Sequence, residues 1–515
     1  MRRALVAALL LVTGTVSIGA AVVAGRRVTL ISDIHYDPLY GKHHAYKCTK
    51  KSSPVWGTPG CDSSPQLTAR ALEDVSAHNT SLVLYSGDWQ RHHYSRSGLE
   101  PATLFKDLSQ RFRNITVDGS LGAIAFSASL GNNDVVPDYY FALEDAATNE
   151  QLSYRVDAML EEGLLSPAEA AVIRKCGYYT HELAHVHVIV LHTLLWAYRL
   201  EPELPSSVDD PCGQFSFLKS ELQRVRAAGK RAIVMGHIPP GLNAYGVLDH
   251  GFRSAVEDMF WKEAYEATYD SIIHDFRDLV AVQLFGHTHK FTLLTLPRNG
   301  ALSIIVPAVS PIFSNNPSYL VAEFSDAWAM EDAVIRYTTS DGVFHSGLTT
   351  TAALNLPSGG LQSVSDVRAA ITRLATNDTT WERFLTIFCG GEKRLGVFPK
   401  ATCDDNCRYV VVCSMLENNH SEIQRCVANY TARTPPSSED ARTSGGMIAA
   451  VLIFSFLVIG AGAVLLLMSR SGQTTISWEN VSSLVWWRSL LERQKRSGTV
   501  TVSDDAEAGE REGNS

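Results

Sequence analysis

The chain has 515 residues, of which 45% are hydrophobic and 19% are charged. These fractions are typical of a folded globular protein and exclude a wholly disordered chain, and the length is enough for more than one domain. The formal net charge of −9 at pH 7 implies no broad basic face, so we expect no nucleic acid among the partners.

Residues 1–25 predict a signal peptide. Met1-Arg2-Arg3 is followed by an apolar run, with small residues near Ala24-Gly25 for cleavage. An uncleaved signal anchor is the alternative. Cleavage is favoured because Val28–Ser32 already has the pattern of a core strand. An anchor that ends near residue 24 would leave almost no linker between the bilayer and that strand.

Residues 447–468 predict a transmembrane helix. The segment carries no charge, and at about 1.5 Å per helical residue its length would cross a hydrocarbon core of about 30 Å. The arginines on its two sides balance, so its orientation rests on the signal peptide. We therefore expect a single-pass type I membrane protein at the cell surface or in a secretory, lysosome-like or vacuole-like compartment. A linker at 431–446 and a cytoplasmic tail at 469–515 complete this arrangement.

All nine cysteines lie ahead of that segment. In an oxidising lumen disulfides are expected, and the odd number leaves one thiol unpaired. The same part of the chain contains acceptor patterns for N-glycosylation at Asn79, Asn114, Asn377, Asn419 and Asn429.

Short apolar runs rich in β-branched residues alternate with helical patterns along the chain. We expect strands at 28–32, 81–85, 122–130, 185–194, 231–235, 279–283, 303–306, 319–324 and 333–337. We expect helices at 65–78, 100–113, 216–228 and about 253–278, and a helix-rich insert at 138–175. This alternation predicts an α/β fold with βαβ units and a sheet covered by helices on both faces.

Polar residues follow five of these strands where each strand ends. They are Asp33 and His35, Asp88, Asn132, His237, and the pair His287 and His289. In open α/β sheets, function gathers outside the carboxyl ends of the strands. Carboxylate, amide and imidazole groups without thiolate suit zinc, manganese or iron. Seven such groups exceed one tetrahedral site and fit two metals, roughly 3.5–4 Å apart, whose bridging water becomes the attacking hydroxide.

These motifs resemble those of the calcineurin-like metallophosphoesterases. The matching segments are Asp33-Ile-His35, Gly87-Asp88, Gly131-Asn132, Gly236-His237 and Gly286-His287-Thr-His289. In order and spacing they are most similar to the acid sphingomyelinase-like phosphodiesterases and the endopolyphosphatases. The resemblance implies a metallophosphoesterase-type β-sandwich flanked by helices, here at residues 26–345.

The resemblance also implies a role for each ligand. Asp33, His35 and His289 would hold one metal ion, and Asn132, His237 and His287 would hold the other. Asp88 would bridge the two ions, and His92 matches a histidine implicated in protonating the leaving group. Zinc is the favoured metal, with manganese or iron left open.

The similarity extends to a small, helical, disulfide-bonded C-terminal lobe, expected at residues 346–430. Asp210-Pro-Cys-Gly-Gln-Phe215 resembles an element that opens a helix in this group. The resemblance implies four disulfides and a free Cys389, with the pairs Cys403–Cys407, Cys413–Cys426, Cys48–Cys61 and Cys176–Cys212.

One motif departs from the family. Where most members read Gly-Asn-His, this chain reads Gly131-Asn132-Asn133. An asparagine can donate a hydrogen bond to phosphate but cannot deliver a proton. That loss matters least for a phosphoanhydride, whose leaving phosphate is already a stable anion. Endopolyphosphatases resemble this chain in reading Gly-Asn-Asn-Asp at this position. We therefore expect Asn133 to stabilise developing negative charge.

Basic residues follow two of the ligands closely. Lys42 and His43 lie in a loop after His35, and Arg91 lies after Asp88. We expect these three residues to bind an anionic, phosphate-containing substrate, although an ordinary solvated loop is the alternative for the stretch from Lys42.

The sequence thus predicts a dinuclear phosphoric ester or anhydride hydrolase in which a metal-bridged hydroxide attacks phosphorus. Endopolyphosphatase activity or nucleotide phosphoanhydride cleavage is favoured over a sphingomyelin-type phosphodiesterase. A non-catalytic, metal-binding surface receptor is the alternative from another class, and the presence of all seven ligands argues against it.

Overall fold

The computed structural model describes residues 26–433, apart from residues 44, 46, 51–53, 117–123, 144–148, 395 and 399–402. The predicted signal peptide, transmembrane segment and cytoplasmic tail lie outside the described residues, as does the linker after residue 433. The predicted boundaries of the domains stay predictions.

The predicted localisation needs correction. Among the described residues, no helix is both long and apolar enough to span a bilayer. The longest of them, α2 (Pro101–Thr116), has 16 residues, which at about 1.5 Å each reach only about 24 Å. The prediction of a single-pass membrane protein is therefore wrong on this finding, because no described helix supplies the span that it requires.

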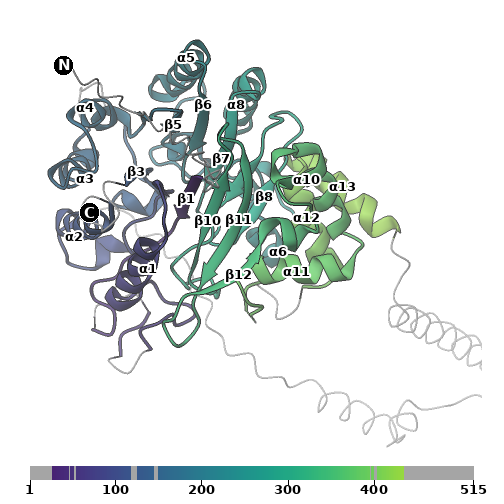
Figure 1. Ribbon diagram of the computed structural model, residues 1–515, viewed down its shortest axis with the longest axis horizontal. Helices are drawn as coiled ribbons and strands as arrows, with labels where there is room; N and C mark the ends of the chain where they lie inside the picture. Colours follow the sequence, from purple (N-terminus) through teal and green to yellow (C-terminus); the bar gives the residue numbers. More distant parts are fainter. Residues whose placement is uncertain are drawn as a thin grey trace, which may run out of the picture. The chain divides into compact units, whose positions relative to one another are not determined.

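Two six-stranded sheets form the centre of the described part (Figure 1). In the first sheet, β1 (Arg26–Ile31), β2 (Leu82–Tyr85) and β3 (Ala125–Ala128) run parallel. An antiparallel extension continues from β1 through β10 (Ser318–Phe324), β11 (Met330–Tyr337) and β12 (His345–Thr349). Ile31, Tyr85 and Ala128 stand opposite one another, so the three parallel strands end level.

The second sheet has the order β4-β5-β6-β7-β9-β8. Its strands are β4 (Tyr179–Glu182), β5 (Val186–Val190), β6 (Arg231–Met235), β7 (Val280–Phe285), β9 (Ser303–Ile305) and β8 (Thr292–Leu294). The four strands from β5 to β9 run parallel, and β4 and β8 close the edges in the antiparallel sense. Both sheets therefore present a row of parallel carboxyl ends.

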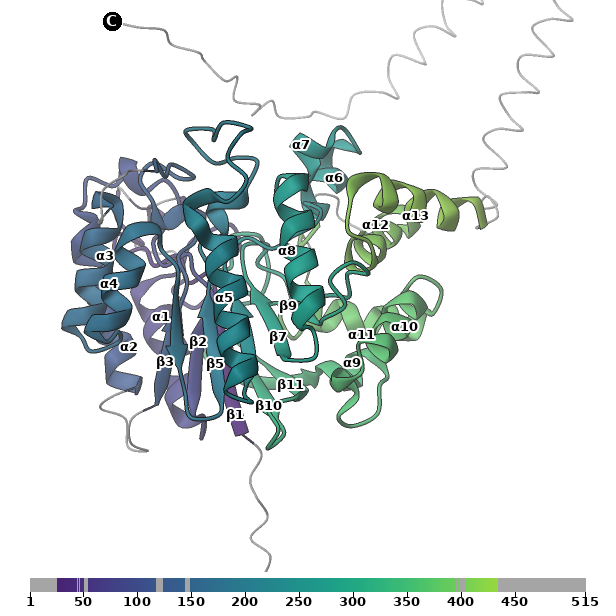
Figure 2. The same cartoon turned by 90° about the horizontal axis from the view of Figure 1, so that it is seen from above.

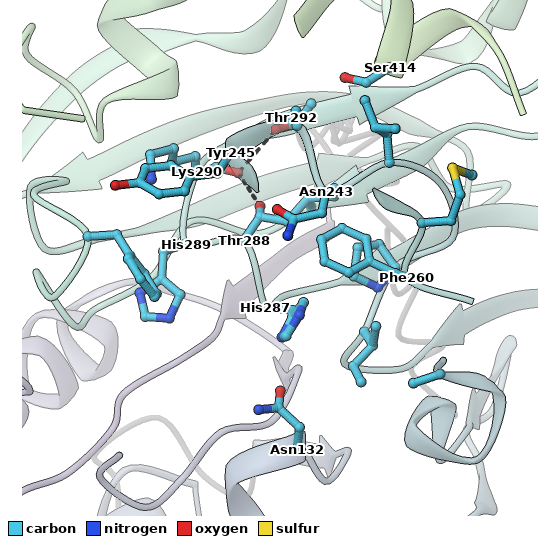
Figure 3. A pocket seen from close by; sticks show the side chains of 18 of the residues that line it. Asn132, Asn243, Tyr245, Phe260, His287, Thr288, His289, Lys290, Thr292 and Ser414 are labelled. Atoms are coloured by element: carbon cyan, nitrogen blue, oxygen red, sulfur yellow. Dashed lines mark hydrogen bonds between the residues drawn. The ribbon is translucent and has the colours of Figure 1, made fainter. Parts of the chain in front are cut away.

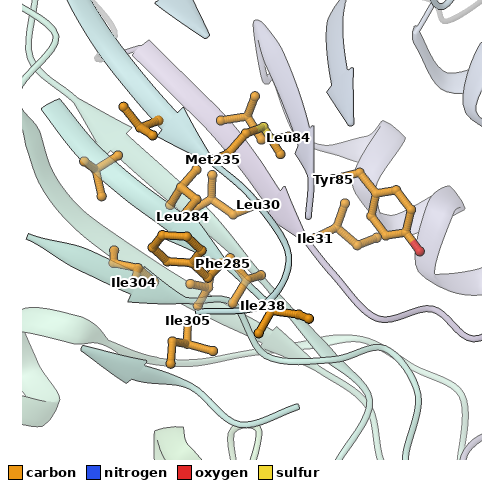
Figure 4. Close-up of a cluster of buried hydrophobic side chains, with 14 of the residues drawn as sticks. Leu30, Ile31, Leu84, Tyr85, Met235, Ile238, Leu284, Phe285, Ile304 and Ile305 are labelled. Carbon is orange, nitrogen blue, oxygen red and sulfur yellow. The ribbon is translucent and has the colours of Figure 1, made fainter. Parts of the chain in front are cut away.

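The core lies between the two sheets. Figure 4 shows Leu30 and Leu84 of the first sheet beside Met235, Leu284 and Phe285 of the second. All five side chains are almost completely buried, and packing of this kind is the main source of stability for the two sheets. The two-sheet arrangement implied by the resemblance is confirmed, and the single sheet inferred from the alternation of elements is wrong.

Helices cover the sheets, and most occur where the sequence predicts them. Four helices precede the second sheet in the sequence, namely α1 (Pro65–Ala77), α2, α3 (Glu150–Glu161) and α4 (Pro167–Cys176). Figure 2 shows α5 (Gln214–Ala227) and α8 (Glu263–Phe276) lying side by side, and α5 packs on β5 and β6. The insert at 138–175 is thus two helices, because Ser166 and Pro167 begin a new one.

Two expected elements are interrupted. The strand expected at 185–194 ends at Val190, because the backbone of His192 bonds to the side chain of Gln214 instead of a neighbouring strand. The helix expected from 253 to 278 is divided into α7 (Ala255–Asp258) and α8. Between the two helices, the backbone of Met259 pairs with that of Leu242, and the backbone of Trp261 pairs with that of Ala197.

The C-terminal lobe is helical, as the resemblance implies. Its helices are α9 (Thr350–Leu354), α10 (Val364–Leu374), α11 (Asp378–Phe388), α12 (Asp405–Leu416) and α13 (His420–Arg433). Arg408 joins three of them, since it donates to the Leu374 carbonyl at 2.5 Å and to Asp378 at 2.7 Å.

All four disulfides expected from the resemblance are present. The pairs are Cys48–Cys61, Cys176–Cys212, Cys403–Cys407 and Cys413–Cys426. Cys389 is free and buried, as expected.

Candidate metal centre

The seven predicted ligands meet at the carboxyl ends of the parallel strands. Five of them have backbone φ angles between +43° and +72°, in the left-handed region, and these are Asp33, His35, Asp88, His287 and His289. Such a conformation costs about 1–3 kcal/mol at a residue other than glycine, and it persists only where surrounding contacts impose it. Here the Asp33 and His35 amides donate to the carbonyls of Gly87 and Asp88 at 3.0 and 3.1 Å. The strain is therefore concentrated at the candidate site.

Two glycines make room for the ligands. A Cβ atom on Gly131 would lie 1.9 Å from Oδ1 of Asp88, and one on Gly286 would lie 2.6 Å from Oδ2 of Asp33. Any side chain at either position would therefore displace a candidate ligand.

The first group of ligands gathers around His35. Its Nε2 atom lies 3.3 Å from Oδ2 of Asp88, 3.8 Å from Oδ1 of Asp33 and 3.1 Å from Nε2 of His289. Nε2 of His289 is in turn 3.4 Å from Oδ1 of Asp33. The other ring nitrogen of His35 lies 3.1 Å from the carbonyl of Gln90, which fixes the ring.

The second group gathers around His237. Its Nε2 atom lies 3.2 Å from Oδ2 of Asp88 and 3.1 Å from Oδ1 of Asn132. Asp88, His237 and His287 can each point one ligand atom at a common point, all within 4.8 Å of one another. The same oxygen of Asp88 therefore faces one imidazole from each group.

Burial and neighbouring charges act in opposite directions on these groups. Burial disfavours imidazolium, but the nearby carboxylates together outweigh it. Asp88, Asp33 and Asp62 raise the pKa of His35 to about 10, and Asp88 and Asp33, with the Ser86 carbonyl, raise that of His237 to about 9. For His287 and His289, burial and then the neighbouring imidazoles hold the pKa well below its usual value. Burial also opposes ionisation of Asp88, but the facing imidazoles hold the pKa of its carboxyl well below the usual range.

The donor set fits divalent cations. Lone pairs of carboxylate, amide and imidazole groups converge in a buried space, and the contact between His35 and His289 brings two imidazole nitrogens together. A cation that accepts both lone pairs relieves this crowding. Nδ1 of His289 is also buried without a hydrogen-bond partner among the described residues. These clusters could therefore bind metal ions.

His92 lies at the edge of the first group. Its ring stacks on that of His35, with centroids 4.1 Å apart, and it can point a nitrogen at the same place as His35 and His289. Asp62 holds it at two atoms, since it accepts hydrogen bonds from the backbone amide and from Nδ1 of His92, both at 2.9 Å. Asp62 was not identified from the sequence, because it lies in an irregular loop with no motif around it.

Asn133 and Asp134 support the carboxylate and backbone of Asp88. The side-chain amide of Asn133 donates to Oδ2 of Asp88 at 2.9 Å, so the predicted contact of this amide with substrate stays a prediction. Asp134 accepts from the backbone amides of Asp88, Trp89, Gln90 and Gly131 at 2.7–3.2 Å. Its role was also missed, although it completes the Gly-Asn-Asn-Asp motif.

A cavity of about 470 Å³ opens from these ligands. His92 and Asn133 line it, together with Asp88, Asn132, His287 and His289. Lys42, His43 and Arg91 are not among the described lining residues. Arg91 is buried and pairs with Asp37 at 3.4 Å, and the ammonium of Lys42 donates to the Pro38 carbonyl at 3.1 Å. The structure therefore places these three residues elsewhere than in the cavity.

The rest of the cavity wall is largely apolar (Figure 3). Apolar lining residues include Ile238, Leu242, Leu248, Met259, Phe260, Leu294, Ile305 and Phe313. The C-terminal lobe contributes Phe388, Phe398 and Val411. This wall was not predicted, because nothing local in the sequence marks residues from the two parts of the chain as neighbours.

A third cluster with ligand spacing lies elsewhere. Glu182, His187 and Glu221 could also point ligand atoms at one place. Arg224, however, pairs with both of these glutamates, and Lys230 lies 3.3 Å from His187. Two cations already balance the carboxylates, so we interpret this cluster as an ion-pair network.

Among the acceptor asparagines, Asn79, Asn114, Asn377 and Asn429 are exposed and Asn419 is half-buried. Their glycosylation stays a prediction.

Comparisons with known proteins agree with the site. Residues 26–291 match the family model of the calcineurin-like phosphoesterases. Acid sphingomyelinase-like phosphodiesterase 3b of Mus musculus is 24% identical over 442 residues, which cover 79% of this chain and 91% of that protein. Cyclic GMP-AMP phosphodiesterase of Mus musculus is 22% identical over 435 residues, which cover 78% of this chain and 91% of that protein.

An endopolyphosphatase of Schizosaccharomyces pombe is 23% identical over 285 residues, which cover 50% of this chain and 46% of that protein. The chain thus spans about half the length of this relative. From the family match and the strand-end site together, the chain belongs to the calcineurin-like phosphoesterase family and is a hydrolase.

Proposed function

We propose that the protein is a two-metal hydrolase of phosphoric esters or anhydrides. The observation that carries this proposal is the position of Asp88, whose Oδ2 atom lies 3.3 Å from Nε2 of His35 and 3.2 Å from Nε2 of His237. One carboxylate oxygen facing two imidazoles from different strands is the arrangement that a shared ligand of two cations requires.

Each ion would have its own ligands. Asp33, His35 and His289 would hold one, Asn132, His237 and His287 would hold the other, and Asp88 would belong to both. Two bound divalent ions would neutralise charge on the phosphoryl group and activate a water molecule for in-line attack. Zinc is the favoured metal, because the set contains four imidazoles and no thiolate.

His92 would donate a proton to the leaving group. The carboxylate of Asp62 holds Nδ1 at 2.9 Å, which leaves Nε2 as the nitrogen available to the cavity. A carboxylate behind an imidazole fixes its orientation, and an oriented histidine can act as a general acid.

The favoured substrates are phosphoanhydrides, as in inorganic polyphosphate or nucleotides. Asn133 cannot deliver a proton, and its amide already donates to Asp88. A leaving phosphate needs less protonation than a lipid alkoxide, so a site with asparagine where most family members have histidine suits an anhydride. An endopolyphosphatase is among the relatives.

A sphingomyelin-type phosphodiester is the second candidate. The observation that favours it is the apolar cavity wall, which includes Phe260, Phe388 and Val411 and would accept an aliphatic chain. A relative named as an acid sphingomyelinase-like phosphodiesterase agrees with this alternative.

A substrate panel with metal analysis tests the proposal. The purified full chain would be stripped with a chelator, reloaded with zinc, manganese or iron, and assayed on inorganic polyphosphate, ATP and sphingomyelin at acid and neutral pH. We expect two ions per chain, loss of activity on stripping, and faster cleavage of anhydrides. Faster release of phosphocholine would reverse the substrate ranking, and two bound ions without turnover would favour a non-catalytic metal-binding protein.

A further inference from the structure

Lys290 is a buried cation in the wall of the candidate active site. It follows His289 directly, only 5% of its surface is exposed, and it lines the same cavity. The hydroxyls of Thr288 and Thr292 donate to its backbone carbonyl at 3.4 and 3.2 Å, as the dashed lines in Figure 3 show. The backbone at this position is therefore fixed.

The ammonium of Lys290 rests on aromatic rings. Nζ lies 5.0 Å from the centre of the Tyr245 ring and 5.5 Å from that of Phe313. Among the described residues, no carboxylate lies within 4.0 Å of it. Ring faces offset only part of the cost of burying an ammonium, so the charge remains available to an anion in the cavity.

Phe313 locates this charge relative to the candidate catalytic groups. Its ring centre lies 4.7 Å from the ring of His289 and 6.1 Å from that of His92. The ammonium of Lys290 therefore stands around the same phenyl ring as a candidate metal ligand and the candidate proton donor. His92 and Lys290 also line the same cavity, so a leaving group held near His92 lies in the cavity that this cation lines.

We propose that Lys290 binds a negatively charged leaving group, namely the phosphate next to the scissile one in a phosphoanhydride. This inference rests on the proposed hydrolase function and makes Lys290 the residue that determines preference for anhydrides. The cation would stabilise the phosphate as it departs, because hydrogen bonds between charged groups are stronger than neutral ones. The leaving group of sphingomyelin is the ceramide alkoxide, which carries no phosphate for this cation to bind.

The test compares substrates that differ in the charge of the leaving group. Attack on the terminal phosphorus of tripolyphosphate releases pyrophosphate as the leaving group. Attack on p-nitrophenyl phosphate releases p-nitrophenolate, which carries no phosphate. We expect Lys290→Met to lower kcat/KM for tripolyphosphate about 30-fold more than for p-nitrophenyl phosphate, the size of one charged hydrogen bond. Lys290→Arg, which keeps the charge, should restore most of that preference.

Control variants separate this role from a general loss of structure. Lys106→Met removes a lysine that pairs with Glu161 at 3.3 Å on the surface, and it should leave the ratio of the two activities unchanged. Lys290→Gln provides a second neutral variant if Lys290→Met folds poorly, and metal content would be measured for each protein.

Two failures can be told apart. If the metal-loaded wild-type protein cleaves neither substrate, the proposed function fails. If the wild type cleaves both and the neutral Lys290 variants reduce both activities by the same factor, the hydrolase function stands and the assignment of Lys290 is overturned. The same conclusion follows if Lys290→Arg behaves like Lys290→Met.

Discussion

Asp62 holds His92 through two hydrogen bonds of 2.9 Å, one from the backbone amide and one from Nδ1 of the ring. Because the carboxylate is almost completely buried, it acts on His92 with little screening by solvent. The pair therefore has the geometry of a proton donor and the residue that orients it.

Replacing Asp62 tests this pair. We expect Asp62→Asn to lower kcat about 10- to 100-fold, as the loss of part of general acid catalysis would. The reduction should be larger for phenyl phosphate than for p-nitrophenyl phosphate, because a poorer leaving group depends more on protonation. Equal reductions for the two substrates would indicate a merely structural role, and the measurement is kcat for each substrate as a function of pH.

Asp88 is expected to decide how many metal ions bind. Asp88→Asn weakens the one ligand shared by both groups, so we expect fewer than two ions per chain and a fall in kcat of about 1000-fold. Elemental analysis of the dialysed protein measures the metal content. Asp107→Asn is the control, since Asp107 pairs with Arg111 at 3.1 Å away from the cavity, and full occupancy in Asp88→Asn would contradict a shared ligand.

Asp74 makes stability depend on pH in a definite direction. Burial opposes its ionisation, but contacts with His78, Arg336 and Tyr319 outweigh burial and lower the pKa of Asp74 to about 2. A carboxyl whose pKa is lower in the folded state stabilises the fold above its unfolded value, near 3.8, and this contribution is lost as the pH falls toward 2. After a discount for partial exposure, the contribution is about 1 kcal/mol.

Denaturation of Asp74→Asn by urea at several pH values checks this sign. We expect the variant to be less stable than the wild type at pH 7 by about 1 kcal/mol, with a smaller difference at pH 3. Asp326→Asn is the matched control, because its exposed pair with Arg26 is 4.0 Å long and should contribute nothing measurable. A difference that grows on acidification would contradict the assignment.

The disulfide between Cys413 and Cys426 should stabilise the C-terminal lobe. It closes a loop of 13 residues, for which chain entropy gives about 3 kcal/mol. The double variant C413S/C426S should therefore unfold at lower urea concentration. Cys389→Ser, which removes the free buried thiol without breaking a bond, is the control and should cost less.

The candidate ligands could be predicted because their signals are local. Each buried strand is a short apolar run, and the polar residue that ends it stands next to it in the sequence, as Asp88 follows Leu82–Tyr85. The pairing of β1 with β10 has no such local signal, because the paired residues Leu30 and Leu320 lie far apart in the sequence. A single sheet was therefore inferred where the protein has two.

Other features depend on contacts that the sequence does not display. The apolar residues after Val190 read as a strand, yet Thr193–Trp196 are buried in a 3-10 turn, and burial alone does not distinguish the two. Arg91 was expected to face substrate because it follows Asp88, but its side chain turns inward to Asp37. Asp62 and Lys290 gain their importance only from what surrounds them in space.

The C-terminal lobe completes the cavity wall with Phe388 and Val411, far along the chain from the last candidate ligand. Evolution can therefore retune which molecules this enzyme accepts by mutating helices that take no part in bond cleavage. Relatives with identical reactive groups can therefore act on different substrates, and a comparison of their C-terminal lobes would distinguish those substrate preferences.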